Sequence, residues 1–301
     1  MSARTRARAI RLTFFLALAT VLSCVPGTGL SSLLPGEAAS AAPYCGATVT
    51  KTDGTPWVCT FADEFTGDSL DASKWVPITT AGNGFTSGSE CFVNSANNVK
   101  VAQGALSLTV RKEARPLSCK TPGGSFRTSY TGGYVASWNR FAQTYGRYEI
   151  RARFPSTQTA GLQSALWLYP RTLTYGAWPA SGEIDIAELF TRYPDRAIPY
   201  LHYQEHSADA NVTNNYCMMD TAAWHTYVLE WTASSITIKY DDQVCLTTTT
   251  WYPDGLDMPA PFDHPYFLNL TQGLGVGGNA FNSKTTQLPA TTQVDYVRVW
   301  S

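Results

Sequence analysis

Three carboxylates lie within six residues in the segment 178–188, which reads Trp-Pro-Ala-Ser-Gly-Glu-Ile-Asp-Ile-Ala-Glu. In a β-strand, successive side chains point to opposite faces, so Glu183 and Asp185 would share one face and the isoleucines the other. Glu188 falls on the wrong face unless one extra residue, a β-bulge near Ala187, brings it back. Packing three like charges together destabilises a fold. The segment therefore indicates a cleft in which carboxylates perform acid–base or nucleophilic chemistry.

The alternative interpretation of this segment is a solvated edge strand that carries acids on its wet face, as antiparallel sheets often do. The flanking residues argue against it. Trp178-Pro179 and a pair of small residues precede the acids, and Leu189-Phe190 follows them. A strand whose polar face is merely solvated does not require these flanking aromatic, proline and small residues.

The pattern Glu-x-Asp-x-x-Glu after Trp-Pro-Ala-Ser-Gly resembles the signature of glycoside hydrolase family 16, and more narrowly its bulge-containing laminarinase-like branch, the endo-β-1,3-glucanases. Two stretches depart from the family pattern. Gln163-Ser164 stands where laminarinases often carry Trp-Pro, and residues 189–194 replace a more polar, glycine-rich continuation. The departures leave the substrate less determined than the reaction. Further similar segments span most of the chain, at residues 61–65, 70–75, 145–152, 225–231 and 294–299.

The resemblance implies a retaining hydrolase that cleaves internal β-1,3-glucosidic bonds of a laminarin-like β-glucan. It assigns Glu183 as the nucleophile and Glu188 as the general acid/base, with Asp185 between them to hydrogen-bond Glu183 and set the charge state of the trio. A retaining enzyme needs its two carboxyl groups about 5–5.5 Å apart. Successive same-face strand positions are about 6.6 Å apart, so the bulge and the tilt of the side chains would have to close the gap.

Two other functions remain open at this point. The same machinery could act on another β-linked polysaccharide, such as a galactan or a mixed-linkage glucan. Alternatively, the chain could be a catalytically silent glucan-binding protein, although such relatives are expected to have lost the two glutamates. No cofactor is expected for catalysis, because the sequence contains no His-Glu-x-x-His, Gly-x-Ser-x-Gly or phosphate-loop pattern.

Aromatic side chains can stack on the apolar faces of sugar rings, and Trp178 beside the motif is the first candidate for such a platform. Core packing is the alternative for any single aromatic residue. His202 could face the cleft or lie satisfied in the core, and Glu230 with Trp231 resembles a family strand that reaches the cleft floor. The weaker aromatic candidates are Trp167, Tyr169 and Tyr203.

The resemblance also implies a structural calcium ion away from the cleft, with an aspartate of the closing strand as a ligand. The corresponding residue here is Asp295. Carboxylate oxygens suit this hard cation. An ordinary solvent-facing aspartate is the alternative interpretation.

The N-terminus has the pattern of a secretory signal peptide. Four arginines up to residue 11 precede an apolar run from residue 12 to about 22, and small residues follow at 38–42. This order of basic, apolar and small residues predicts a leader over residues 1–42, cleaved after Ala41 or Ala42, and an extracellular protein. The run is too short for a durable transmembrane helix. A lipoprotein site at Cys24 is the less favoured alternative.

Without the leader, the chain keeps six of its seven cysteines and has a net charge of −4. An even number of cysteines in an exported protein predicts three disulfides, among 15 possible pairings, with buried free thiols as the alternative. A mildly acidic chain without a basic cluster does not indicate a nucleic-acid partner. We expect a monomer whose partner is a polysaccharide. We expect cysteines to pair in chain order, as Cys45–Cys59, Cys91–Cys119 and Cys217–Cys245.

Short alternating segments and frequent turns predict an all-β protein. Alternation is clear at 105–110, 147–153, 235–240 and 294–300, and Asp241-Asp242 marks a turn. Periodicity alone predicts a sandwich or a barrel. The family resemblance narrows this to a two-sheet antiparallel jelly roll with an open cleft on its concave face. No linker or repeat appears after residue 43, so residues 43–301 are expected to form a single catalytic domain.

Overall fold

The computed structural model describes residues 43–205 and 212–301, and the predicted leader lies outside them. These described residues belong to one compact unit. Its helical elements are α1 (Thr80–Asn83) and the 3-10 turn η2 (Gly277–Asn279). Its strands are β1 (Cys59–Asp63), β2 (Val76–Pro77), β3 (Cys91–Phe92), β4 (Val99–Ala102), β5 (Ala105–Thr121), β6 (Gly124–Ala136), β7 (Gly146–Arg153), β8 (Leu162–Pro170), β9 (Glu183–Phe190), β10 (Ile198–His202), β11 (His225–Trp231), β12 (Ile236–Tyr240), β13 (Gln243–Thr248), β14 (Tyr266–Leu274) and β15 (Ala290–Trp300).

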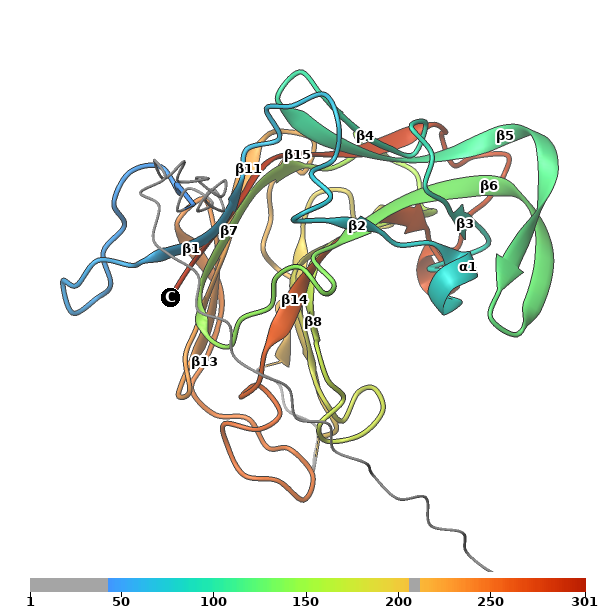
Figure 1. Ribbon diagram of the computed structural model, residues 1–301. Helices are drawn as coiled ribbons and strands as arrows, with labels where there is room; N and C mark the ends of the chain where they lie inside the picture. Colours follow the sequence, from blue (N-terminus) through green and yellow to red (C-terminus); the bar gives the residue numbers. More distant parts are fainter. Residues whose placement is uncertain (1–42, 206–211) are drawn as a thin grey trace, which may run out of the picture. The chain divides into compact units, whose positions relative to one another are not determined.

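Eleven of these strands form one hydrogen-bonded path in the order β10-β9-β8-β14-β6-β5-β15-β7-β11-β12-β13, and β1 to β4 pair with strands of this path. The first half, β10 to β6, makes the sheet that carries the acidic motif. The second half, β5 to β13, makes a second sheet, and the long β5–β6 hairpin joins the two. In Figure 1 this hairpin extends away from the other strands, and α1 and β3 lie beside it. The predicted antiparallel two-sheet fold is therefore confirmed.

The main hydrophobic core lies between these two sheets. Leu166, Leu168 and Ile184 enter it from the first sheet, and Ile150 and Val297 enter it from the second. Side chains at alternate positions of each strand reach this core, because the pleat turns every second residue to the same face. The opposite face of the first sheet is consequently left to polar and aromatic residues.

The predicted turn at Asp241-Asp242 joins β12 to β13. Both aspartates have positive φ angles, 47° and 65°. This left-handed backbone matches the right-handed twist of the flanking strands in a tight hairpin. The predicted turn is thus confirmed as the hairpin that joins the last two strands of the second sheet.

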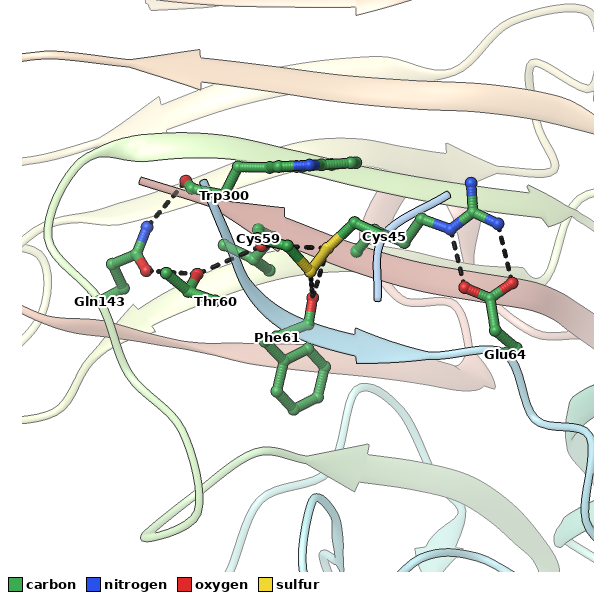
Figure 2. Close-up of a disulfide and its surroundings, with 9 residues drawn as sticks. Cys45, Cys59, Thr60, Phe61, Glu64, Gln143 and Trp300 are labelled. Atoms are coloured by element: carbon green, nitrogen blue, oxygen red, sulfur yellow. Dashed lines mark hydrogen bonds and ion pairs between the residues drawn. A yellow bond between two sulfur atoms is a disulfide. The ribbon is translucent and has the colours of Figure 1, made fainter. Parts of the chain in front are cut away.

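Three disulfides join the cysteines in the predicted chain order: Cys45–Cys59, Cys91–Cys119 and Cys217–Cys245. Figure 2 shows how the first of them fastens the segment before β1 to the body of the second sheet. Beside it, Thr60 donates to Gln143, and Gln143 donates in turn to the main-chain oxygen of Trp300. Within residues 43–205 and 212–301, no helix has the length and apolar character needed to cross a membrane.

Candidate active site

The acidic motif forms β9, and a β-bulge interrupts this strand where the sequence predicts one. On the β8 side, Leu166 pairs with Ala187 while the next residue, Trp167, pairs with Asp185. On the β10 side, Pro199 alone stands opposite both Ile186 and Ala187. The additional residue, at Ile186–Ala187, shifts the alternation by one position. Glu188 therefore returns to the face that carries Glu183 and Asp185.

A hydrogen bond from the other sheet supports the bulge. The hydroxyl of Tyr240, on β12, donates to the main-chain oxygen of Ile186 at 2.9 Å. Ile186 and Ala187 are both fully buried in the core. A bulge removes a main-chain group from the ladder, and a buried group of this kind must find another partner. Tyr240 supplies that partner.

All three acids line one cavity of about 870 Å³ on the face of the first sheet that is turned away from the core. The strand β8 contributes alternate residues to its floor, and β10 and β14 add side chains on either side. The loop that contains α1 forms a further wall. A volume of this order is typical of a ligand site rather than of a packing defect.

Each acid of the trio has one close polar neighbour. The indole Nε1 of Trp178 donates to Glu183 Oε2 at 2.7 Å. The amide Nε2 of Gln163 donates to Glu188 Oε1 at 2.9 Å. His202 Nε2 lies 3.0 Å from Asp185 Oδ2, close enough for an ion pair when the imidazole is protonated, but without the alignment of a hydrogen bond.

Burial raises the pKa of all three carboxyl groups above their ordinary values. Asp185 is 2% exposed and Glu188 9% exposed, so their charged forms lose most of their hydration. The charge of Asp185 further raises the pKa of Glu183 and of Glu188, whereas the hydrogen bonds from Trp178 and Gln163 oppose the rise. The pKa of Glu188 reaches about 8. The trio is therefore poised to hold a proton near neutral pH.

Three of the predicted sugar-binding residues lie on the wall of this cavity: Trp178, Trp167 and His202. Trp178 is 53% exposed and offers the most open aromatic surface at the acids. Trp167 is largely buried, and its indole nitrogen donates to Thr271 at 2.9 Å. Tyr169, one of the weaker candidates, also lines the cavity.

The predictions for Glu230, Trp231 and Tyr203 are wrong. Glu230 lies on the second sheet, where Arg147 and Lys239 form ion pairs with it. Trp231 is fully buried between the sheets. Their strand, β11, belongs to the sheet that does not form the cavity, which a local motif cannot reveal. Tyr203 follows β10 but turns into the core, where its ring meets Phe262.

Several cavity residues were not identified from the sequence. Gln163 was noted only as a departure from the family pattern, although it precedes Trp167 by four positions on an alternating strand and thus had to share its face. The others come from the α1 loop, β6 and the turn after it, and β14, far from the motif in the chain, and no local signal marks them. They include Phe85, Tyr134, Trp138, Phe267 and Thr271.

The residues around Asp295 do not fit the expected calcium ion. The carboxylate of Asp295, on β15, forms an ion pair with the guanidinium of Arg151. A calcium ion needs six to eight oxygen ligands. The Asp295 carboxylate oxygen that would serve as one of them is already paired with the guanidinium of Arg151. In the described part of the chain, the one group of three acid or histidine side chains close enough to share an ion is Glu183, Asp185 and His202.

Comparison with known proteins gives a consistent result. Residues 87–297 match the family model described as "Glycosyl hydrolases family 16". "Glucan endo-1,3-beta-glucosidase A1" of Niallia circulans is 30% identical over 261 residues, which cover 79% of this chain and 37% of that protein. "Endo-1,3-1,4-beta-glycanase EglC" of Rhizobium meliloti (strain 1021) is 30% identical over 209 residues, 69% of this chain and 40% of that protein. The alignments thus span less than half of these two relatives.

A solved structure agrees with these relatives. The laminarinase from Rhodothermus marinus superposes with a TM-score of 0.66 at 28% sequence identity. The superposition covers 81% of this chain and 97% of that structure. The likeness therefore extends over nearly the whole of a known laminarinase fold.

Proposed function

The chain belongs to glycosyl hydrolases family 16, and from this premise we propose that it cleaves internal β-1,3-glucosidic bonds of a laminarin-like β-glucan by double displacement. The observation that supports the proposal is the bulge in β9, because it turns Glu188 to the cavity wall that also carries Glu183. Bond cleavage of this kind requires two carboxyl groups at one sugar. The names of the relatives and of the similar structure support β-1,3-glucan as the substrate.

In the proposed reaction, the Glu183 carboxylate attacks the anomeric carbon while Glu188 gives its proton to the glycosidic oxygen. The bond between that carbon and oxygen breaks, and the leaving sugar departs with a new hydroxyl group. Glu188, now a carboxylate, then takes a proton from water as the water displaces Glu183, so the product keeps the configuration of the substrate. Burial raises the pKa of both glutamates, so the trio holds a proton near neutral pH; the proposal places that proton on Glu188 and the charge on Glu183, which accepts the hydrogen bond from Trp178.

Trp178 supports the nucleophile and Asp185 supports the general acid in this proposal. Trp178 donates to Glu183 Oε2 and so favours the charged carboxylate. Its exposed indole face remains available for stacking on a sugar ring. Asp185 is the most buried acid of the trio, and its charge raises the pKa of Glu188, which favours the protonated form that the general acid needs.

Secretion is part of the same proposal. The predicted leader over residues 1–42 and the three disulfides support an extracellular location, because disulfides persist mainly outside the cytosol. A polysaccharide too large to enter a cell would be met there.

A second candidate substrate is a mixed-linkage β-glucan. Gln163 and Phe190, one from each of the two stretches that depart from the family pattern, both line the cavity. The Rhizobium meliloti relative is named an endo-1,3-1,4-β-glycanase. Reducing-sugar release from laminarin, mixed-linkage glucan and a galactan would decide between the candidates, and laminarin is expected to be hydrolysed fastest.

The variants Glu183→Gln and Glu188→Gln test the mechanism. Each removes an ionisable group without changing its shape, so laminarin hydrolysis should fall by about 10²-fold or more while thermal unfolding stays cooperative. NMR of the first product should show the β-anomer before mutarotation. Full activity in either folded variant, or release of the α-anomer, would contradict double displacement by these two residues.

A further inference from the structure

We propose that Gln163 is the positioning residue of the general acid: its amide Nε2–H holds Glu188 by Oε1 and leaves Oε2 to carry the proton toward the glycosidic oxygen. This inference rests on the proposed function, because it concerns the residue given the role of the acid. It assigns a role to a position at which the chain departs from the family pattern.

The strand register places Gln163 beside Glu188. Ala165 lies directly opposite Glu188 across β8 and β9, and Gln163 is the diagonal neighbour on the same face. Because Ala165 is small, the longer Gln163 side chain can reach across it. Nε2 of Gln163 lies 2.9 Å from Oε1 of Glu188. Among the described residues, no other side chain donates a hydrogen bond to this carboxyl group.

A buried polar network fixes the backbone from which Gln163 projects. Gln272, on β14, donates to the main-chain oxygen of Gln163. Its own Oε1 accepts hydrogen bonds from Ser164 at 2.6 Å and from Thr292 at 2.7 Å. Ser164, Gln272 and Thr292 are all fully buried. Hydrogen-bonded side chains in such surroundings hold one arrangement, so the amide of Gln163 starts from a rigid base.

The chemistry of this contact favours proton release. When Glu188 gives up its proton, negative charge develops on its carboxylate, and an N–H bond to a charged acceptor is about twice as strong as one to a neutral acceptor. The Gln163 bond therefore strengthens in the transition state, which is the condition under which an interaction accelerates a reaction. The same bond opposes the rise in the pKa of Glu188 that burial causes.

The variant Gln163→Met tests the proposal, because it keeps the length of the side chain and removes the donor. On laminarin, kcat should fall about tenfold with little change in KM, since orientation and acidity of the acid are lost but not the binding surface. The alkaline limb of kcat/KM against pH should move to higher pH, because without the donor Glu188 keeps its proton longer. Gln163→Glu, which places a like charge beside Glu188, should move the limb in the same direction.

Two comparisons make the outcome decisive. Gln243→Met makes the same exchange at an exposed position of β13, away from the cavity, and should leave kcat and the pH profile unchanged. If Gln163→Met loses activity without moving the alkaline limb, its role is structural and the proposal is wrong; unchanged kcat also overturns it. Activity retained by Glu188→Gln would instead contradict the proposed function itself, so the two failures can be told apart.

Discussion

At the scale of single residues, the candidate site concentrates buried charge. Glu183, Asp185 and Glu188 share one cavity. Each glutamate accepts one hydrogen bond, from Trp178 or Gln163, and His202 lies 3.0 Å from Asp185 without a hydrogen bond. Such an arrangement lowers the stability of the folded protein while it makes the carboxyl groups reactive. This loss of folding stability should therefore be measurable as a dependence of stability on pH.

We predict that Glu188→Gln stabilises the protein more at pH 8 than at pH 5. The pKa of Glu188 is raised from 4.5 to about 8 in the folded state. Its contribution to stability is complete below pH 4.5 and is lost as pH rises through about 8, because the folded state resists ionisation. Replacing Glu188 with glutamine removes this pH-dependent loss of stability. The gain at pH 8 relative to pH 5 should exceed about 1 kcal/mol.

Thermal unfolding at the two pH values would measure the effect, with about 2–4 °C in Tm for each kcal/mol in a domain of this size. Asp68→Asn, at an exposed position of a loop, serves as the control and should show no such difference. An equal shift in Tm at both pH values would contradict the interpretation that burial of Glu188 is costly.

At the scale of secondary structure, the bulge in β9 depends on a residue of the opposite sheet. Tyr240 takes up the main-chain oxygen of Ile186, and the strand pairing on either side holds the flanking residues. The position of Glu188 is thus set by packing between the two sheets as well as by the motif itself. Removing the hydroxyl of Tyr240 separates the contribution of the opposite sheet from that of the motif.

We expect Tyr240→Phe to lower the free energy of unfolding by about 1–3 kcal/mol, because the oxygen of Ile186 would remain buried without a partner. It should also lower kcat about tenfold, since small displacements of reacting groups are costly. Urea unfolding and steady-state kinetics on laminarin would measure both quantities.

Tyr227→Phe is the matched control for this variant. Its side chain is also buried in the same core and its ring is in edge contact with the Tyr240 ring, but its hydroxyl donates to the sulfur of Met219 at 3.9 Å. It should lose little stability and keep its kcat. If both variants behave alike, the bulge does not depend on the hydrogen bond from Tyr240.

At the scale of the whole molecule, a disulfide fastens the N-terminal segment that lies outside the main core. The Cys45–Cys59 bond holds the residues before β1 against the last strand, β15, on the side of the second sheet (Figure 2). Glu64 strengthens the same region by accepting two hydrogen bonds from Arg298. This region lies outside the residues that line the cavity.

The double variant Cys45→Ala/Cys59→Ala should therefore lose stability while its active-site cavity stays intact. A disulfide that closes a loop of 14 residues contributes about 3 kcal/mol by restricting the unfolded chain. We expect Tm to fall accordingly while kcat on laminarin at 25 °C stays unchanged. The Cys217–Cys245 bond closes twice that span, and its removal should cost about 0.6 kcal/mol more. An unchanged Tm in the first variant would show that the bond is not structural.

Sequence patterns determined the local features of this protein. Alternation identified strands, Asp241-Asp242 identified a hairpin, and the misfit of Glu188 with strict alternation predicted the bulge that the structure contains. These features depend on neighbours along the chain, since pleating and turn geometry act over a few residues. The order of the cysteines also predicted their pairing, and the acidic motif identified the family.

Only the tertiary structure decided which sheet each strand joins. Glu230 and Trp231 resembled cleft residues, yet β11 lies in the sheet without the cavity, and Asp295 is engaged by Arg151 rather than by oxygen ligands. Conversely, Gln163 gained its contact with Glu188 because two strands happen to pair in that register. Contacts between residues distant in the chain depend on strand order and register, and local periodicity contains no information about either.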